Sequence, residues 1–159
     1  MYEREAIMTQ ASHQTGKVVS LAVSTKKGIP KTCVSEVTVV ENHGIEGDAH
    51  AGPWHRQVSL LAREGIETMV AKGLTVGFGD FAENVATEGI DWLKVPVGTR
   101  VALGDAVVLE ITQIGKTCHK PCAIFHRAGD CIMPREGIFG KVLTGGTLRV
   151  GDAVSVGAV

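Results

Sequence analysis

Residues 101–114 read VALGDAVVLEITQI, two apolar runs joined by Gly104-Asp105. Both runs, 101–103 and 106–114, are rich in the β-branched residues that favour strands. Glycine adopts a positive φ without steric cost and aspartate tolerates one, so the pair between the runs is typical of a tight turn. The stretch therefore predicts a β-hairpin, and the same Gly-Asp pair at residues 151–152 predicts a second hairpin corner.

The rest of the chain repeats this pattern of short apolar runs between turns. Many glycines (20 of 159 residues) and few aromatic residues (4%) favour short strands and tight turns over a helical bundle. Strands are expected at residues 18–24, 36–40, 57–61 and 148–150, and the run 81–85 precedes a turn at 88–89. This pattern predicts a mainly β fold, a β-barrel-like domain with helical inserts.

Helices are expected at only two places. Residues 63–72 space Ile66, Met69 and Val70 for one buried face, and Gly73 follows as a C-terminal cap. Residues 121–128 form a candidate short helix with Pro121 in its first turn.

Length and charge limit the class of protein. A chain of 159 residues fits one domain, and we expect residues 1–17 to be a disordered leader and 18–159 the folded domain. The net charge of −1 gives no reason to expect nucleic-acid binding. No apolar stretch approaches the roughly 20 residues needed to span a bilayer, and residues 1–17 lack a secretory pattern. We therefore expect a cytoplasmic protein with no membrane partner.

The strongest chemical signal is a cysteine among basic residues that follows the strand 106–114. Cys118 lies beside Lys116, His119 and Lys120. Positive neighbours lower a thiol's pKa, and the thiolate is the form that attacks sulfur or binds a soft metal. We expect Cys118 to be the most reactive of four cysteines, with Cys122 as a possible resolving thiol.

Three interpretations of this segment stay open. Cys118 can be a structural thiol beside solvated lysines. It can belong to a zinc site, although the spacing matches no common zinc motif; the available ligands are Cys118, His119, Cys122, His126 and Cys131. It can also be a nucleophilic or sulfur-carrying cysteine. Cys33 has no motif around it and is expected to be structural.

Two further polar segments are candidate ligand-binding loops. Residues 44–56 are rich in glycine and carry Asp48, His50 and Arg56, which can bind a metal, orient a polar ligand or simply hold the loop. Residues 79–85 include Glu83 and Asn84, which can form a hydrogen-bonded corner or line a pocket. Spacing alone does not decide between these roles.

Taken in order, these segments resemble the MOSC family, named for the C-terminal domain of molybdenum-cofactor sulfurases, over residues 16–157. Each piece is weakly specific, but the ordered set is specific. The matching pieces are GIEGDAH (44–50), RQVSLL (56–61), GFGDFAENV (77–85), PVGT (96–99), TQIGKTC (112–118) and GGTLRVGD (145–152).

The resemblance implies an antiparallel β-barrel fold similar to the β-barrel domain of pyruvate kinase, and a signature cysteine at Cys118. In sulfurases that domain receives sulfur as a persulfide from a pyridoxal-phosphate cysteine desulfurase and transfers it to molybdenum. In amidoxime-reducing relatives the equivalent cysteine ligates molybdenum. This sequence contains no desulfurase domain, so pyridoxal phosphate is expected only on a partner protein.

The expected function is that of a sulfur carrier for the molybdenum cofactor, with Cys118 carrying persulfide or ligating molybdenum; if the protein is an enzyme, the expected activity is that of a sulfur transferase. The expected partners are a cysteine desulfurase as donor and molybdopterin-biosynthesis proteins or molybdoenzymes. The alternatives are a molybdenum-dependent reductase of N-hydroxylated compounds and a zinc-stabilised interaction domain. For molybdopterin, the residues expected to meet its phosphate are Lys116, Lys120 and Arg56, with His119 beside them. Those expected to hydrogen-bond its pterin are Asp48, His50, Glu83 and Asn84.

Overall fold

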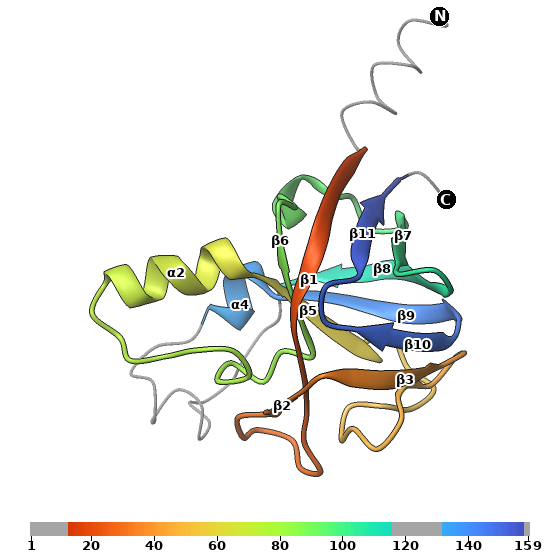
Figure 1. Ribbon diagram of the computed structural model, residues 1–159, viewed down its shortest axis with the longest axis horizontal. Helices are drawn as coiled ribbons and strands as arrows, with labels where there is room; N and C mark the ends of the chain where they lie inside the picture. Colours follow the sequence, from red (N-terminus) through yellow and green to blue (C-terminus); the bar gives the residue numbers. More distant parts are fainter. Residues whose placement is uncertain (1–12, 116–131, 158–159) are drawn as a thin grey trace, which may run out of the picture.

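The computed structural model describes residues 13–115 and 132–157 (Figure 1). Its main sheet has the strand order β11-β7-β8-β9-β5-β6-β1-β2, and an additional pairing of β11 with β1 closes seven of these strands into a barrel. Neighbouring strands are antiparallel except for the parallel pair β5 and β6. The strands are β1 (Gln14–Val23), β2 (Thr32–Val34), β5 (Val58–Ala62), β6 (Val85–Glu88), β7 (Arg100–Leu103), β8 (Val107–Ile114), β9 (Ile138–Thr144) and β11 (Ala153–Val156). The predicted mainly β, antiparallel barrel is confirmed.

A smaller sheet lies against the barrel. It has the order β10-β3-β4, formed by β10 (Gly146–Arg149), β3 (Glu36–Val40) and β4 (Gly44–Ile45). Along β3 buried and exposed residues alternate, with Val37 and Val39 turned inward. This is the period of two expected for a strand with one wet face, and it places both valines in the barrel's core cluster.

Helix α2 (Arg63–Ala71) covers a second, separate apolar cluster and extends to one side of the barrel (Figure 1). Ile66 and Met69 are buried as the spacing predicts, and Gly73 has a φ of +96° after the helix end. Val70 is 50% exposed, so its predicted place on the buried face is wrong: it lies outside the arc that Ile66 and Met69 share. Two short helical turns, η1 (Trp92–Lys94) and α4 (Met133–Glu136), complete the described structure.

The two Gly-Asp pairs have different outcomes. Gly104-Asp105 joins the antiparallel strands β7 and β8, as predicted. Gly151-Asp152 is not a hairpin corner, because β10 pairs with β3 whereas β11 pairs with β1 and β7. The chain leaves the small sheet there and enters the barrel. Asp152 supports the turn by accepting a hydrogen bond from the backbone N–H of Arg149 at 2.9 Å.

Several element boundaries also differ from expectation. β1 begins at Gln14, four residues before the expected start of the folded domain, because residues 14–17 pair with β11. β6 begins at Val85, where the run 81–85 ends. β2, β4 and β9 were not predicted, and β11 was implied only as the second strand of the expected hairpin at 151–152. The candidate helix 121–128 lies outside the described residues. Within the described residues no helix is long and apolar enough to cross a membrane.

Candidate functional site

A buried ion pair anchors the loop that follows β4. The ammonium of Lys31 lies 2.8 Å from Asp48 Oδ1, and both side chains are fully buried. Burial acts to raise the pKa of Asp48, but the hydrogen bond and charge of Lys31, with the backbone N–H groups of Ser24 and His50, hold this pKa below its ordinary value of 3.8. Asp48 is therefore an ionised carboxylate whose hydrogen bonds hold Lys31 and the backbone of Ser24 and His50 in place.

His50 lies on the outer side of this pair. Its Nδ1 is 2.9 Å from Lys31 Nζ, and its backbone N–H donates to Asp48 Oδ2 at 3.1 Å. Its carbonyl accepts a 2.7 Å hydrogen bond from the indole N–H of Trp54. The His50 side chain is 22% exposed. Its backbone is held by two hydrogen bonds while part of its imidazole ring stays accessible.

His50 lines a pocket of about 260 Å³ whose walls are cationic and aromatic: Lys27, Gly28, His50, Trp54, Arg56 and Phe139. The Arg56 guanidinium lies 4.6 Å from the centre of the Trp54 ring and 5.6 Å from that of Phe139, and the Lys27 ammonium lies 4.7 Å from Trp54. Rings that stack on a cation hold it without neutralising it. The buried Arg56 Nε has no hydrogen-bond partner within the structure described.

The pocket adjoins the end of β8, from which the chain continues toward Cys118. His55 Nε2 lies 2.8 Å from Gln113 Oε1, the hydroxyl of Thr112 donates to the His55 carbonyl, and Phe139 pairs with Gln113 across the sheet. Gly115 then has a φ of +70° and passes so close to the Pro134 carbonyl that a Cβ would not fit. Gly115 is thus held in a defined backbone conformation next to Pro134.

Glu83 and Asn84 lie elsewhere, inside the fold, and each is only 1% exposed. Glu83 accepts hydrogen bonds from the backbone N–H groups of Gly79 (2.6 Å) and Phe81 (3.3 Å). Asn84 accepts one from the N–H of Ser59 and donates one to the Ala22 carbonyl. Both side chains bind backbone, so they hold β1, β5 and the 79–84 turn together and do not line the pocket.

Burial raises the pKa of Glu83 from 4.5 to about 7, although its backbone hydrogen bonds oppose this, and the charge of Asp80 adds to the rise.

The structure thus brings together three of the expected ligand-binding residues, Asp48, His50 and Arg56, and separates Glu83 and Asn84 from them. Lys31 and Trp54 were missed. Nothing in the sequence indicates that Lys31, which precedes a strand, is buried. Trp54 lies between Pro53 and His55, a context typical of a loop residue with no particular role. The expected residues that lie outside the described structure are Lys116, Cys118, His119 and Lys120.

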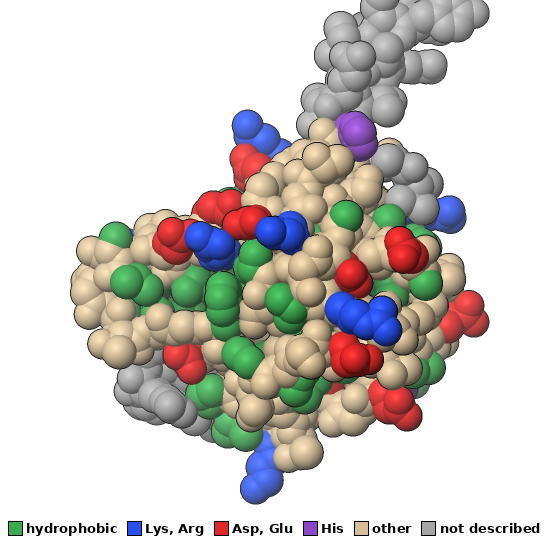
Figure 2. All heavy atoms as spheres, viewed as in Figure 1, with side chains coloured by type: hydrophobic (Ala, Val, Ile, Leu, Met, Phe, Trp, Pro, Cys, Tyr) green, Lys and Arg blue, Asp and Glu red, His purple; other side chains and the backbone are tan. Residues whose placement is uncertain are grey.

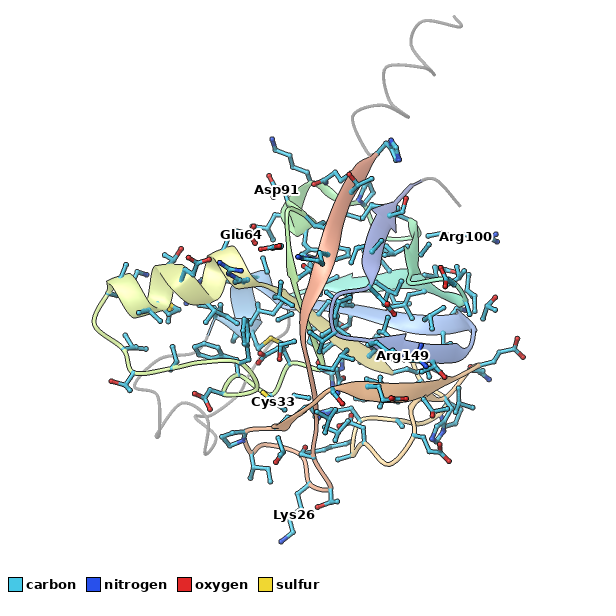
Figure 3. All side chains as sticks on the ribbon, viewed as in Figure 1. Lys26, Cys33, Glu64, Asp91, Arg100 and Arg149 are labelled. Carbon is cyan, nitrogen blue, oxygen red and sulfur yellow. The ribbon has the colours of Figure 1, made fainter. Side chains whose placement is uncertain are left out.

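The zinc interpretation also depends on residues outside the described structure, namely Cys118, His119, Cys122, His126 and Cys131. Over residues 13–115 and 132–157 no group of three His, Cys, Asp or Glu side chains is arranged to hold a metal ion. Cys33, expected to be structural, is an exposed thiol on β2, and its Sγ lies 3.5 Å from the Phe78 carbonyl oxygen (Figure 3). It lies outside the pocket wall.

The surface around these elements carries mixed charge. Figure 2 shows acidic and basic side chains interspersed over the visible face, in line with the net charge of −1. The cationic character of the pocket is therefore local, produced by Lys27 and Arg56 on a nearly neutral protein.

Known proteins provide independent comparisons for the whole chain. No curated protein matches it significantly. Among solved structures, the YuaD protein of Bacillus subtilis is similar with a TM-score of 0.74 and 20% identity, over 91% of this chain and 96% of that one. YiiM of Geobacillus stearothermophilus has a TM-score of 0.67 and 20% identity, over 89% of this chain and 74% of that one. YiiM of Escherichia coli has a TM-score of 0.63 and 18% identity, over 88% and 69% respectively.

At these identities the solved structures show a shared fold. The family itself is shown by a sequence profile, which matches residues 46–155 as a MOSC domain and so spans the buried Asp48, the pocket residues His50 to Arg56 and β5 to β11. The chain therefore belongs to the MOSC domain family.

Proposed function

We propose that this protein is a sulfur carrier for the molybdenum cofactor, in which Cys118 holds persulfide sulfur beside an anion-binding pocket formed by Arg56, His50 and Trp54. The MOSC family is linked to binding or sulfuration of this cofactor. The observation that carries the proposal is the Arg56 guanidinium, which lines the pocket over the rings of Trp54 and Phe139.

Covalent geometry supports the placement of Cys118. Cys118 is the third residue after Gly115, and three residues of chain span at most about 11 Å. Gly115 is held by a 2.6 Å hydrogen bond from its N–H to the Gly137 carbonyl, and Phe139, two residues further along, lines the pocket. This short length of chain supports the proposal that Cys118 acts next to the pocket.

The residues present fit a molybdopterin-type ligand. Such a ligand carries a phosphate, and Arg56 offers a guanidinium whose planar fork suits phosphate oxygens. Trp54 and Phe139 provide apolar surface next to that charge. When bound, the cofactor supplies a molybdenum centre that accepts a sulfur ligand.

The protein's own chemistry is an exchange at sulfur. The Cys118 thiolate attacks the terminal sulfur of a persulfide on a partner cysteine desulfurase; an S–S bond to Cys118 forms, and the desulfurase cysteine leaves as its thiolate. Lys116, His119 and Lys120 favour this by stabilising the thiolate of Cys118. Pyridoxal phosphate is needed only on the desulfurase, which generates the persulfide.

Mass spectrometry of the intact protein after incubation with a cysteine desulfurase and cysteine tests the proposal. The wild type is expected to gain the mass of one sulfur atom, and Cys118→Ser to gain none. The matched control is Cys33→Ser, because Cys33 is an exposed thiol outside the pocket wall, and this variant should gain sulfur like the wild type. Equal sulfur uptake by Cys118→Ser and the wild type would overturn the assignment.

The same preparation separates the carrier from a molybdenum-dependent reductase. Protein produced in a host that makes molybdopterin is analysed for metal before and after Cys118→Ala. A carrier is expected to be isolated without stoichiometric molybdenum yet to accept persulfide. Stoichiometric molybdenum that is lost on Cys118→Ala would favour the reductase instead.

A further inference from the structure

The buried ammonium of Lys31 suggests a role beyond stability, because it touches the ring of His50, a residue that lines the pocket. A lysine ammonium has three N–H donors and no acceptor. Around Lys31 Nζ lie Ser24 Oγ at 3.2 Å, Asp48 Oδ1 at 2.8 Å and His50 Nδ1 at 2.9 Å. The first two are acceptors, so the contact with His50 is chemically consistent only if Nδ1 accepts as well.

We infer that Lys31 fixes His50 as the neutral tautomer that carries its proton on Nε2, so that His50 presents an N–H donor to the pocket. A proton on Nδ1 would point at the ammonium and set two donors against each other at 2.9 Å. An imidazolium carries protons on both nitrogens and would do the same. Lys31 is thus a positioning residue that acts on the ligand through His50.

The ring has the orientation that this role requires. Asp48 holds the His50 backbone N–H, and Trp54 holds the His50 carbonyl, so the side chain projects from a fixed backbone. Nδ1 faces the buried Lys31 at 2.9 Å, and Asp48 Oδ2 lies 3.8 Å from it, beyond hydrogen-bond distance, so Nε2 is the ring nitrogen that can meet a ligand. The polar side chains of the pocket wall are then the donors and cations of His50, Arg56 and Lys27, next to the rings of Trp54 and Phe139.

This composition defines the class of ligand group. A wall of N–H donors and positive charge selects an anionic group that accepts hydrogen bonds, such as a phosphate ester, and rejects cations and groups that only donate. It also makes His50 a poor metal ligand here, because Nδ1 faces Lys31 and Nε2 is protonated. The assignment of the anion as the phosphate of the cofactor rests on the proposed function, whereas the tautomer does not.

Nuclear magnetic resonance of the ¹⁵N-labelled full chain tests the tautomer directly. The chain has six histidines, and His50 is assigned by the signal that disappears in His50→Gln. In the wild type we expect the two-bond correlations of an unprotonated Nδ1 and a protonated Nε2. A proton on Nδ1, or a fast mixture of both tautomers, would overturn the inference whether or not the protein carries sulfur.

The role of Lys31 is tested in the double variant Lys31→Met/Asp48→Asn. Removing both charges avoids leaving Asp48 ionised and alone in the interior, which would threaten folding. We expect the His50 signals to shift to a mixture of tautomers. Affinity for inorganic phosphate, used as the probe, should fall in proportion to the share of His50 that no longer carries its proton on Nε2, about twofold for an equal mixture.

The control is Arg100→Gln, an exposed arginine on β7 that lies across the molecule from the loop carrying Lys26 and Lys27 (Figure 3). This variant should keep both the wild-type phosphate affinity and the wild-type tautomer. Unchanged His50 signals in a folded double variant would show that Lys31 does not set the tautomer. Unchanged phosphate affinity with altered signals would show that His50 does not contact the anion.

Discussion

Asp48 and Glu83 are two buried carboxylates in one small domain, and their environments act in opposite directions. Asp48 faces the ammonium of Lys31 at 2.8 Å, and its pKa is held below 3.8. Glu83 faces only backbone N–H groups and the like charge of Asp80, and burial raises its pKa to about 7. Near neutral pH the first is fully ionised, while the second is close to its midpoint.

The difference lies in the partner that each side chain holds. Asp48 fixes a cation that in turn orients His50 at the pocket, whereas Glu83 fixes the turn at Gly79. The two are joined through the backbone, because the N–H of Lys31 donates to the Gly79 carbonyl at 2.7 Å and a Cβ on residue 79 would collide with the Lys31 carbonyl. The turn at residues 79–83, which Glu83 holds, therefore also fixes the backbone of Lys31, whose side chain pairs with Asp48.

Replacing the cation should have the largest effect. In Lys31→Met the methionine fills a similar volume but leaves the Asp48 carboxylate buried without its cation. Removing one partner of a buried pair costs about 3–5 kcal/mol, so the free energy of unfolding should fall by that amount. Urea denaturation at neutral pH measures it.

The matched control for that variant is Lys94→Met. Lys94 is 76% exposed and pairs with Asp91 at 3.7 Å, a pair of the kind that contributes about 0.5 kcal/mol or less. A loss in Lys31→Met as small as that in Lys94→Met would mean that Asp48 takes up a proton or finds water in place of Lys31.

Glu83 should give the next largest effect, visible as a dependence of stability on pH. Its pKa is raised in the folded protein, so between pH 4.5 and 7 the unfolded chain loses this proton before the folded chain does. The contribution of protonated Glu83 to the free energy of unfolding is fully present below pH 4.5. It is lost as the pH rises to about 7, and the total loss is about 3 kcal/mol. Asp48 acts in the opposite sense and in a different window, because its contribution is present above pH 3.8 and is lost as the pH falls below it.

Urea denaturation of the wild type and Glu83→Gln at intervals from pH 4.5 to 8 separates the two carboxylates. The glutamine cannot ionise, so the variant should lose most of the decline between pH 4.5 and 7, even though its amide group disturbs one of the two backbone hydrogen bonds. An identical slope in both proteins would assign the proton uptake to another group.

The fold was largely accessible from the sequence, because local signals and tertiary structure agree in most of it. β3 was predicted at its observed bounds, since valines alternate with polar residues. β7, β8 and α2 were predicted within two residues. β9 was missed because Gly140 and Lys141 interrupt its pattern and its first three residues are buried without alternation. The exchange of sheets at Gly151-Asp152 depends on pairing between distant strands, which no local pattern encodes.

The site was only partly accessible. Polar residues in a glycine-rich loop indicated Asp48, His50 and Arg56, because such loops commonly carry function. The same reasoning indicated Glu83 and Asn84, but their partners are backbone groups of Gly79, Phe81, Ser59 and Ala22. Composition identifies a side chain that can bind; only the fold shows whether its hydrogen bonds are already used.

The smallest effect tests whether the charge near Glu83, and not burial alone, contributes to its raised pKa. Asp80 accepts a 2.8 Å hydrogen bond from the N–H of Gly77, and its charge raises the pKa of Glu83. Asp80→Asn keeps a carbonyl oxygen that can accept the hydrogen bond from Gly77 and removes the negative charge. The ionised form of Glu83 is then more stable relative to its protonated form. We expect the Glu83 pKa to move below about 7, seen in the ¹³C signal of its carboxyl group during a pH titration, and stability at pH 8 to rise by about 0.5 kcal/mol or less.

Asp105→Asn, in the β7–β8 turn, removes the same charge elsewhere and should leave the Glu83 titration unchanged. If both variants shift the titration equally, the effect is one of net charge, and if neither does, burial alone sets the contrast with Asp48.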